Sequence, residues 1–117
     1  MPLEITECQE NQVTILICNG EIKVFYDAKI LREKLRCLII SGRNKIVIDM
    51  TRTTRFEVSG IREILDPILK IRDDGGDIKL LSPNKRVVKK LEKLRLDRTF
   101  EIFNGKRGRQ KAIASFS

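Results

Sequence analysis

Histidine and tryptophan are absent from this chain of 117 residues. Without histidine the chain has no Ser-His-Asp triad, no Cys-His pair and no zinc site with histidine ligands. The three cysteines, Cys8, Cys18 and Cys37, are odd in number and show no C-x-x-C spacing. They are therefore expected to be buried, reduced thiols of a cytoplasmic protein. Nothing in the sequence pairs two carboxylates in a cleft, so we expect neither an enzyme nor a cofactor.

Long apolar runs and phosphate-binding glycine loops are also missing. No run approaches the ~18 apolar residues needed to cross a bilayer, and the acidic start MPLEITECQE lacks the apolar core of a secretory signal. Neither G-x-x-x-x-G-K-[ST] nor G-x-G-x-x-G occurs after a strand-like run. We therefore expect one soluble cytoplasmic domain that spans residues 1–117 and has no transmembrane segment.

Basic residues are concentrated in one region. The formal net charge is +8, and residues 85–111 contain eleven Lys or Arg residues against three acidic ones, so the rest of the chain is neutral overall. Lys85, Lys89 and Lys93 recur at a spacing of four residues, which places them on one face of a helix. Three interpretations stay open for this face: solvation, contact with an acidic protein or anionic membrane surface, and nucleic-acid binding. One tyrosine, five phenylalanines and no recognised nucleic-acid motif disfavour the last.

Hydrophobic patterning predicts strands that alternate with helices. The segments with strand patterns are residues 3–8, 12–20, 45–50, 77–81 and 99–103. The first two are expected to form a hairpin, with the second strand ending at the Asn19-Gly20 turn signal. The run KIVIDM at 45–50 is typical of a strand covered on both faces.

Three segments have helical spacing, and a fourth helix can follow at the C-terminus. The first is expected to begin at Asp27 as N-cap and stop at Gly42. The second contains Pro67, which predicts a kink or break near Asp66. The third is expected after Ser82 as N-cap, with Pro83 as first helical residue. This order predicts an α/β fold, a mixed sheet of four or five strands packed by helices.

Three stretches together resemble STAS domains over residues 10–115. They are NGEIKVFYDAKILREKL, KIVIDMTRTTRFEVSGI and GGDIKLLSPNKRVVKKLEKLRLDRTFEIF, and their order and spacing resemble those of the family. The resemblance is to the anti-sigma factor antagonist group of bacterial transcription regulators. It implies signal transduction by protein–protein interaction, with an anti-sigma factor, usually a serine kinase, as partner. The alternative is a STAS subunit or scaffold of a signalling or lipid-transport complex.

Two positions depart from the pattern of that group. Its usual Asp-Ser-Ser/Thr-Gly motif, phosphorylated at the first hydroxyl residue, corresponds here to Glu57, Val58, Ser59 and Gly60. Valine cannot accept a phosphate. The resemblance thus implies either a permanently unphosphorylated, binding-competent protein or phosphorylation at Ser59. Lys23 stands where the group usually has aspartate.

The residues themselves leave other roles open. Ser59 is interpreted either as a helix N-cap or as an interface residue, and Val58 either as a core contact of the hydrophobic-staple kind or as an apolar partner contact. The predicted partner-binding surface consists of Glu21, Lys23, Thr53, Phe56, Glu57, Val58, Ser59, Gly60 and Ile61. This surface is expected to extend along the loop and the first half of the second helix, from Thr53 to Ile64, and the segment from Glu21 to Phe25 is expected to join it.

Overall fold

A mixed β-sheet organises the fold of the computed structural model, which describes residues 2–23 and 25–117. Its main path runs β1-β2-β3-β5-β6, in which only β1 is antiparallel to its neighbour. The strands of this path are β1 (Glu4–Glu10), β2 (Val13–Ile22), β3 (Lys45–Asp49), β5 (Asp77–Leu81) and β6 (Ile102–Phe103). The predicted α/β fold with a mixed sheet is confirmed, and so are the hairpin and the buried strands.

A further strand, β4 (Thr53–Phe56), pairs in parallel with the far end of β2. The sequence pattern placed this segment in a loop, which is wrong. The prediction that β2 ends at Asn19-Gly20 is also wrong, because β2 continues to Ile22 after a register shift between Gly20 and Glu21. The first half of β2 thus pairs with β3 and its second half with β4.

The β1–β2 hairpin turns at Asn11 and Gln12. Both have positive φ, 51° and 68°, as a two-residue type I′ turn requires. Asparagine tolerates this conformation better than most residues do. The turn fixes the register in which Glu10 lies opposite Val13.

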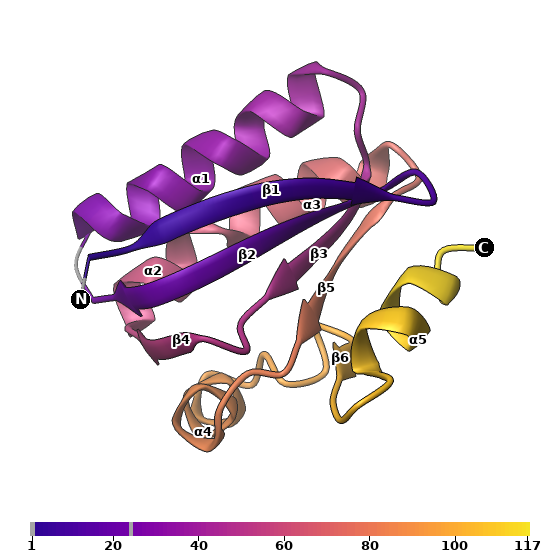
Figure 1. The fold of residues 1–117 in the computed structure, drawn as a ribbon. Coiled ribbons are helices and arrows are strands. Elements are labelled where there is room, and N and C mark those ends of the chain that lie inside the picture. Colours follow the sequence, from indigo (N-terminus) through magenta and orange to yellow (C-terminus); the bar gives the residue numbers. More distant parts are fainter. Residues whose placement is uncertain (1, 24) are drawn as a thin grey trace.

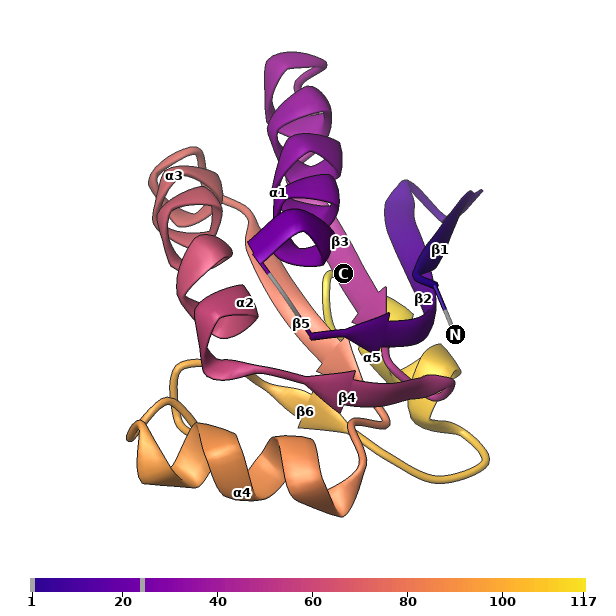
Figure 2. The ribbon, with the colours of Figure 1, turned by 90° about the vertical axis from the view of Figure 1, so that its left-hand side faces the viewer.

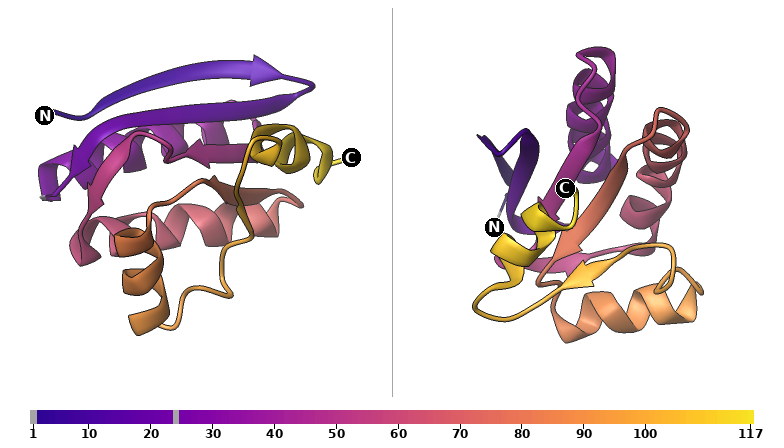
Figure 3. Two further views of the ribbon diagram at one scale, coloured as in Figure 1. Left: turned by 60° about the horizontal axis from the view of Figure 1, so that its bottom comes forward. Right: turned by 90° about the vertical axis from the view of Figure 1, so that its right-hand side faces the viewer.

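Helices cover both faces of the sheet. α1 (Phe25–Ile40), α2 (Val58–Glu63) and α3 (Leu65–Asp73) lie together on one face, and α5 (Gly108–Ala114) lies on the other (Figures 1 and 3). α4 (Lys85–Lys93) runs beside β4 at one end of the molecule (Figure 2). Within the described residues no helix is long and apolar enough to cross a membrane.

Two apolar clusters fill the space between these layers. The larger, under α1 to α3, includes Leu16, Cys18, Leu31, Leu35, Ile46, Ile48, Phe56, Ile61, Ile64 and Ile68. The smaller, under α5, consists of Val13, Ile15, Val47, Leu81, Ala112 and Ile113. β3 contributes to both clusters by alternation, which confirms that it is buried on both faces.

The helix boundaries correct several predicted caps. Asp27 lies inside the first turn of α1, where its carboxylate accepts a hydrogen bond from the backbone N–H of Lys23 at 3.2 Å. Gly42 follows α1 with φ of +78°, as a C-terminal stop requires. The second helical segment breaks at Ile64, two residues before the predicted point, and Pro67 falls in the first turn of α3, where proline is tolerated.

The third helix begins later than predicted. Asn84, not Ser82, is its N-cap, and its Oδ1 accepts a hydrogen bond from the N–H of Val87 at 2.9 Å. Ser82 instead has a positive φ of 51°. Pro83 lies outside the helix, because α4 begins at Lys85.

The cysteines do not share one environment. Cys18 is buried in the larger cluster, Cys8 is half-buried and Cys37 is exposed on α1. The expectation of buried thiols is therefore correct for Cys18 and wrong for Cys37. Burial, and to a lesser degree the charge of Asp49, raises the pKa of Cys18 to about 12.

Candidate functional site

The end of β2 and the start of α2 come together at one end of the molecule. Glu21 pairs with Arg55 across the β2–β4 ladder, and the N–H of Glu57 donates to the carbonyl of Ile22 at 2.9 Å. The two predicted parts of the partner surface are therefore neighbours in space. Val24, within the second part, lies outside the described residues.

The predicted surface residues divide into two layers. Glu21, Lys23, Glu57, Val58 and Ser59 are exposed or half-buried. Thr53, Phe56, Gly60 and Ile61 are buried beneath them. The buried layer has a supporting role that can be traced, since the Thr53 hydroxyl donates to the Cys18 carbonyl at 2.7 Å and so holds β4 against β2.

Gly60 allows α2 to pack closely on this layer. A Cβ at this position would lie 2.7 Å from Cε1 of Phe56 and 3.1 Å from Cγ2 of Ile22. Such distances are shorter than van der Waals contact, so any side chain at residue 60 would push α2 away from the sheet.

Ser59 does not cap α2. The N-cap is Glu57, which makes no side-chain capping bond, and Ser59 is the second residue of the helix with an exposed side chain. The interpretation of Ser59 as N-cap is therefore wrong.

Val58, the first residue of α2, is half-buried and belongs to neither of the apolar clusters formed by the described residues. The two positions of a hydrophobic staple are filled instead by Phe56, before the cap, and Ile61, at the fourth helical position. Both are buried in the larger cluster. Val58 thus presents an apolar side chain at the surface, between the exposed Ser59 and the carboxylate of Glu57.

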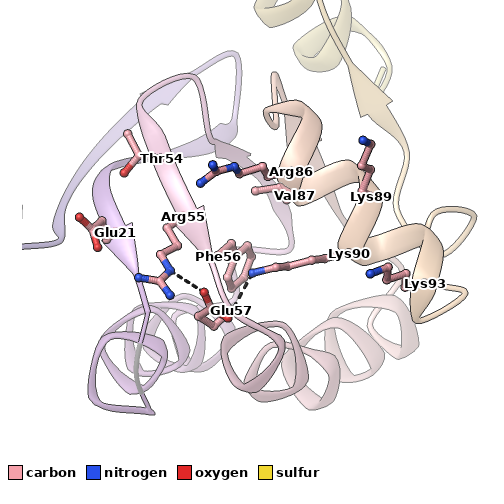
Figure 4. Close-up of a pocket in the computed structure, with 10 residues that line it drawn as sticks. All are labelled: Glu21, Thr54, Arg55, Phe56, Glu57, Arg86, Val87, Lys89, Lys90 and Lys93. Atoms are coloured by element: carbon pink, nitrogen blue, oxygen red, sulfur yellow. Dashed lines mark hydrogen bonds and ion pairs between the residues drawn. The ribbon is translucent and has the colours of Figure 1, made fainter.

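Glu57 is held by cations from two elements. Its Oε1 lies 2.5 Å from Nε of Arg55, and its Oε2 lies 3.1 Å from Nζ of Lys90 on α4 (Figure 4). The hydrogen bond from Arg55 has the larger effect and that from Lys90 the next, and both hold the pKa of Glu57 below its ordinary value. The start of α2 is thereby linked through Glu57 to the basic helix α4.

An open groove of about 580 Å³ lies between β4 and α4. Figure 4 shows its lining residues, which are Glu21, Thr54, Arg55, Phe56, Glu57, Arg86, Val87, Lys89, Lys90 and Lys93. Five of them are cationic and two are carboxylates. The groove is therefore strongly basic, although Lys85, one member of the predicted lysine row, does not line it.

Asn84 holds the two walls of the groove together. Its Nδ2 donates to the carbonyls of Thr53 at 3.1 Å and Thr54 at 3.2 Å, while its Oδ1 caps α4. Asn84, Arg55 and Arg86 were not among the predicted site residues. The regular spacing of the α4 cations was visible, but nothing in the sequence indicated that β4 lies opposite them.

The fold is shared with solved anti-sigma factor antagonists. A putative one from Thermotoga maritima has a TM-score of 0.83 at 22% identity, over 94% of each chain. One from Mycobacterium paratuberculosis has a TM-score of 0.82 at 15% identity, over 97% of this chain and 93% of that one. The phosphorylated form of the Bacillus cell fate determinant SpoIIAA has a TM-score of 0.73 at 16% identity, over 98% and 99% of the two chains. At these identities the likeness concerns the fold.

Sequence comparison identifies the family. The chain matches no curated protein sequence. Residues 5–107, however, match the family described as the STAS domain. That match covers most of the 117 residues and agrees with the observed topology, so the chain belongs to the STAS domain family.

Proposed function

We propose that this protein is a regulatory interaction module of the anti-sigma factor antagonist type, and that it has no catalytic activity of its own. Its partner is an anti-sigma factor of the serine-kinase class, bound at the surface formed by Glu57, Val58, Ser59 and the end of β2. In this role the protein acts in the cytoplasm and regulates transcription by freeing a sigma factor.

The observation that carries this proposal is the partial exposure of an apolar residue, Val58, at the start of α2. Val58 is half-buried outside the core clusters, and the exposed Ser59 follows it. Buried Phe56 and Ile61 and the close contact at Gly60 fix the position of this turn. An apolar side chain on a rigid turn is suited to a protein interface, because little conformational freedom is lost on binding.

The absence of a hydroxyl at residue 58 defines the regulation. A phosphate at the start of a helix would meet free backbone N–H groups and the positive end of the helix dipole. Its charge of about −2 and its hydration would then disrupt a close interface. Val58 cannot receive that group, so the protein stays competent to bind unless Ser59, one residue later, is phosphorylated.

Affinity capture from a lysate of the native host tests where the partner binds. Wild type, Ser59→Arg and Ala114→Arg are compared as baits, because both replaced residues are exposed on helices but lie on opposite faces of the sheet. Capture of an anti-sigma kinase by wild type and Ala114→Arg, with loss for Ser59→Arg, supports the proposal. Equal capture by all three baits, or capture of no kinase, contradicts it.

A further inference from the structure

The groove between β4 and α4 has three basic side chains without an ionic partner in the described part of the chain. Arg86, Lys89 and Lys93 line the groove and make no ion pair there, whereas Arg55 and Lys90 are paired with Glu57. Like charges at four-residue spacing along one helix, such as Lys89 and Lys93, repel each other. An acidic ligand in the groove would relieve that repulsion.

Glu57 shows how the groove holds a carboxylate. One of its oxygens is bound from the strand side by Arg55 and the other from the helix side by Lys90 (Figure 4). The carboxylate therefore bridges the two walls. Two lining cations are matched to a carboxylate already, and the other three are available for carboxylates that come from outside.

We propose that this groove binds an acidic, extended segment of the protein partner, and that Glu57 is an internal carboxylate competing with it. The inference rests on the proposed function in one respect, namely that the partner bound at the start of α2 supplies the segment. Glu57 belongs to both surfaces, so the groove continues directly from the site of partner contact.

The spacing of the cations fits an extended acidic chain. Lys89 and Lys93 are four residues apart on α4, which corresponds to ~6 Å along the helix axis. Alternate residues of an extended chain are separated by ~6.6 Å and point the same way. Acidic residues at every second position can therefore reach successive lysines of α4.

A small phosphate-bearing ligand fits the groove less well. The backbone N–H of Val87, in the first turn of α4, is already satisfied by Asn84. The phosphate would therefore depend on lysine and arginine side chains, several of which are exposed on the helix surface. Tight phosphate sites usually add converging backbone N–H groups.

A fluorescein-labelled oligoglutamate peptide, followed by fluorescence anisotropy at low salt, tests the inference on the purified protein. The double variant Lys89→Ala/Lys93→Ala is compared with Lys29→Ala/Lys70→Ala. All four are exposed helix lysines without an ion pair in the described part of the chain, and both variants lose the same charge. We expect roughly tenfold weaker binding for the groove variant and a much smaller loss for the control.

The second comparison uses Glu57→Gln against Glu92→Gln. Both add one unit of net charge, but Glu92 is on α4 outside the groove. Stronger peptide binding by Glu57→Gln than by Glu92→Gln supports the role of Glu57 as internal competitor. Equal effects within both pairs of variants would show attraction by net charge alone and overturn the inference. Inorganic tripolyphosphate that binds more tightly than the peptide, and depends on the same lysines, would also overturn it.

These outcomes are separate from those of the proposed function. Groove-dependent peptide binding together with unchanged capture by Ser59→Arg would leave the groove as an acidic-segment site and reject the α2 interface. The opposite result is partner capture that depends on Ser59 together with peptide binding that does not change when Lys89 and Lys93 are replaced. It would support the α2 interface and reject the groove as a site for an acidic segment.

Discussion

Nζ of Lys90 lies 3.1 Å from Oε2 of Glu57, and this ion pair joins the basic helix α4 to the residue that precedes α2. Arg55 binds the other carboxylate oxygen. Two surfaces that the sequence presented separately, the turn at residues 56–60 and the lysine row, are thus parts of one continuous region.

The first prediction concerns the pKa of Glu57. Arg55 and Lys90 lower it, so in Lys90→Gln we expect it to rise toward its ordinary value. Because the folded-state pKa is lowered, the ion pair contributes stability above the ordinary pKa and loses it as the pH falls through the folded value. Carboxyl NMR titration measures the shift, with Lys89→Gln as the control that leaves Glu57 unchanged. The same Glu57 pKa in wild type and Lys90→Gln would show that the Lys90 contact does not form in solution.

The second prediction concerns close packing at Gly60. A methyl group in Gly60→Ala would meet the ring of Phe56 at 2.7 Å, so we expect a loss of ~1–3 kcal/mol in the free energy of unfolding, despite the higher helix propensity of alanine. Urea denaturation measures it. Ser59→Ala, at the neighbouring exposed position, should change stability by less than ~0.5 kcal/mol. Equal stability of the two variants would contradict the contact.

The third prediction separates the two roles of Asn84. Asn84→Ala removes the cap of α4 and both bonds to the β4 carbonyls, which should cost ~1–2 kcal/mol of stability. Asn84→Asp keeps an oxygen for the N–H of Val87 but cannot donate to Thr53 and Thr54. Its stability, measured by the same denaturation, should lie between those of wild type and Asn84→Ala. If Asn84→Ala were as stable as wild type, Asn84 would have neither role.

The fourth prediction is a pH dependence caused by Cys18. Its pKa is about 12 in the folded protein, against 9.0 as the ordinary value, so the folded state holds this proton more tightly than the unfolded state does. The associated stability is complete below pH 9.0 and is lost as the pH rises toward 12. The loss approaches ~1.4 kcal/mol per pH unit within that window.

Denaturation of wild type, Cys18→Ala and Cys37→Ala between pH 8 and 10 checks this dependence. Of the three proteins, only Cys18→Ala should show a shallower decrease of the free energy of unfolding with pH. This slope is independent of the stability that the variant loses through the cavity left by the side chain. Cys37 is exposed, so its removal should leave the slope as in wild type. Identical slopes in all three proteins would contradict burial of the Cys18 thiol.

Elements with strong local signals could be predicted from the sequence. The run KIVIDM gave β3, and the apolar positions Ala28, Leu31, Leu35 and Leu38 are the buried face of α1. The continuous apolar run indicates that β3 is covered on both faces, and the helical spacing indicates which side of α1 is buried. The break before Pro67 also follows from local chemistry, because proline is disfavoured inside a helix.

Elements that depend on distant partners could not be predicted. β4 has only four residues and exists because Thr53 to Phe56 pair with the end of β2, more than thirty residues earlier. Asn19 and Gly20 read as a turn, but Asn19 pairs with Glu4 of β1 and Gly20 with Thr53 of β4, so both lie in a strand. The groove was missed for this reason, since one of its walls is β4. The spacing of the lysines on α4 could be recognised in the sequence, but the position of β4 opposite them could not.

Measurement of phosphate on the protein tests the central claim most directly. Wild type, Val58→Ser and Ser59→Ala are each incubated with native-host lysate and ATP and then recovered. Intact-mass spectrometry measures the phosphate on each protein, and any captured kinase is identified. We predict that all three proteins capture an anti-sigma kinase. Only Val58→Ser should then gain a phosphate, and this phosphorylated variant should release the kinase. Phosphate on wild type that Ser59→Ala abolishes would place the switch at Ser59. If no kinase is captured and no protein gains phosphate, the anti-sigma role is contradicted and a scaffold role within another complex takes its place.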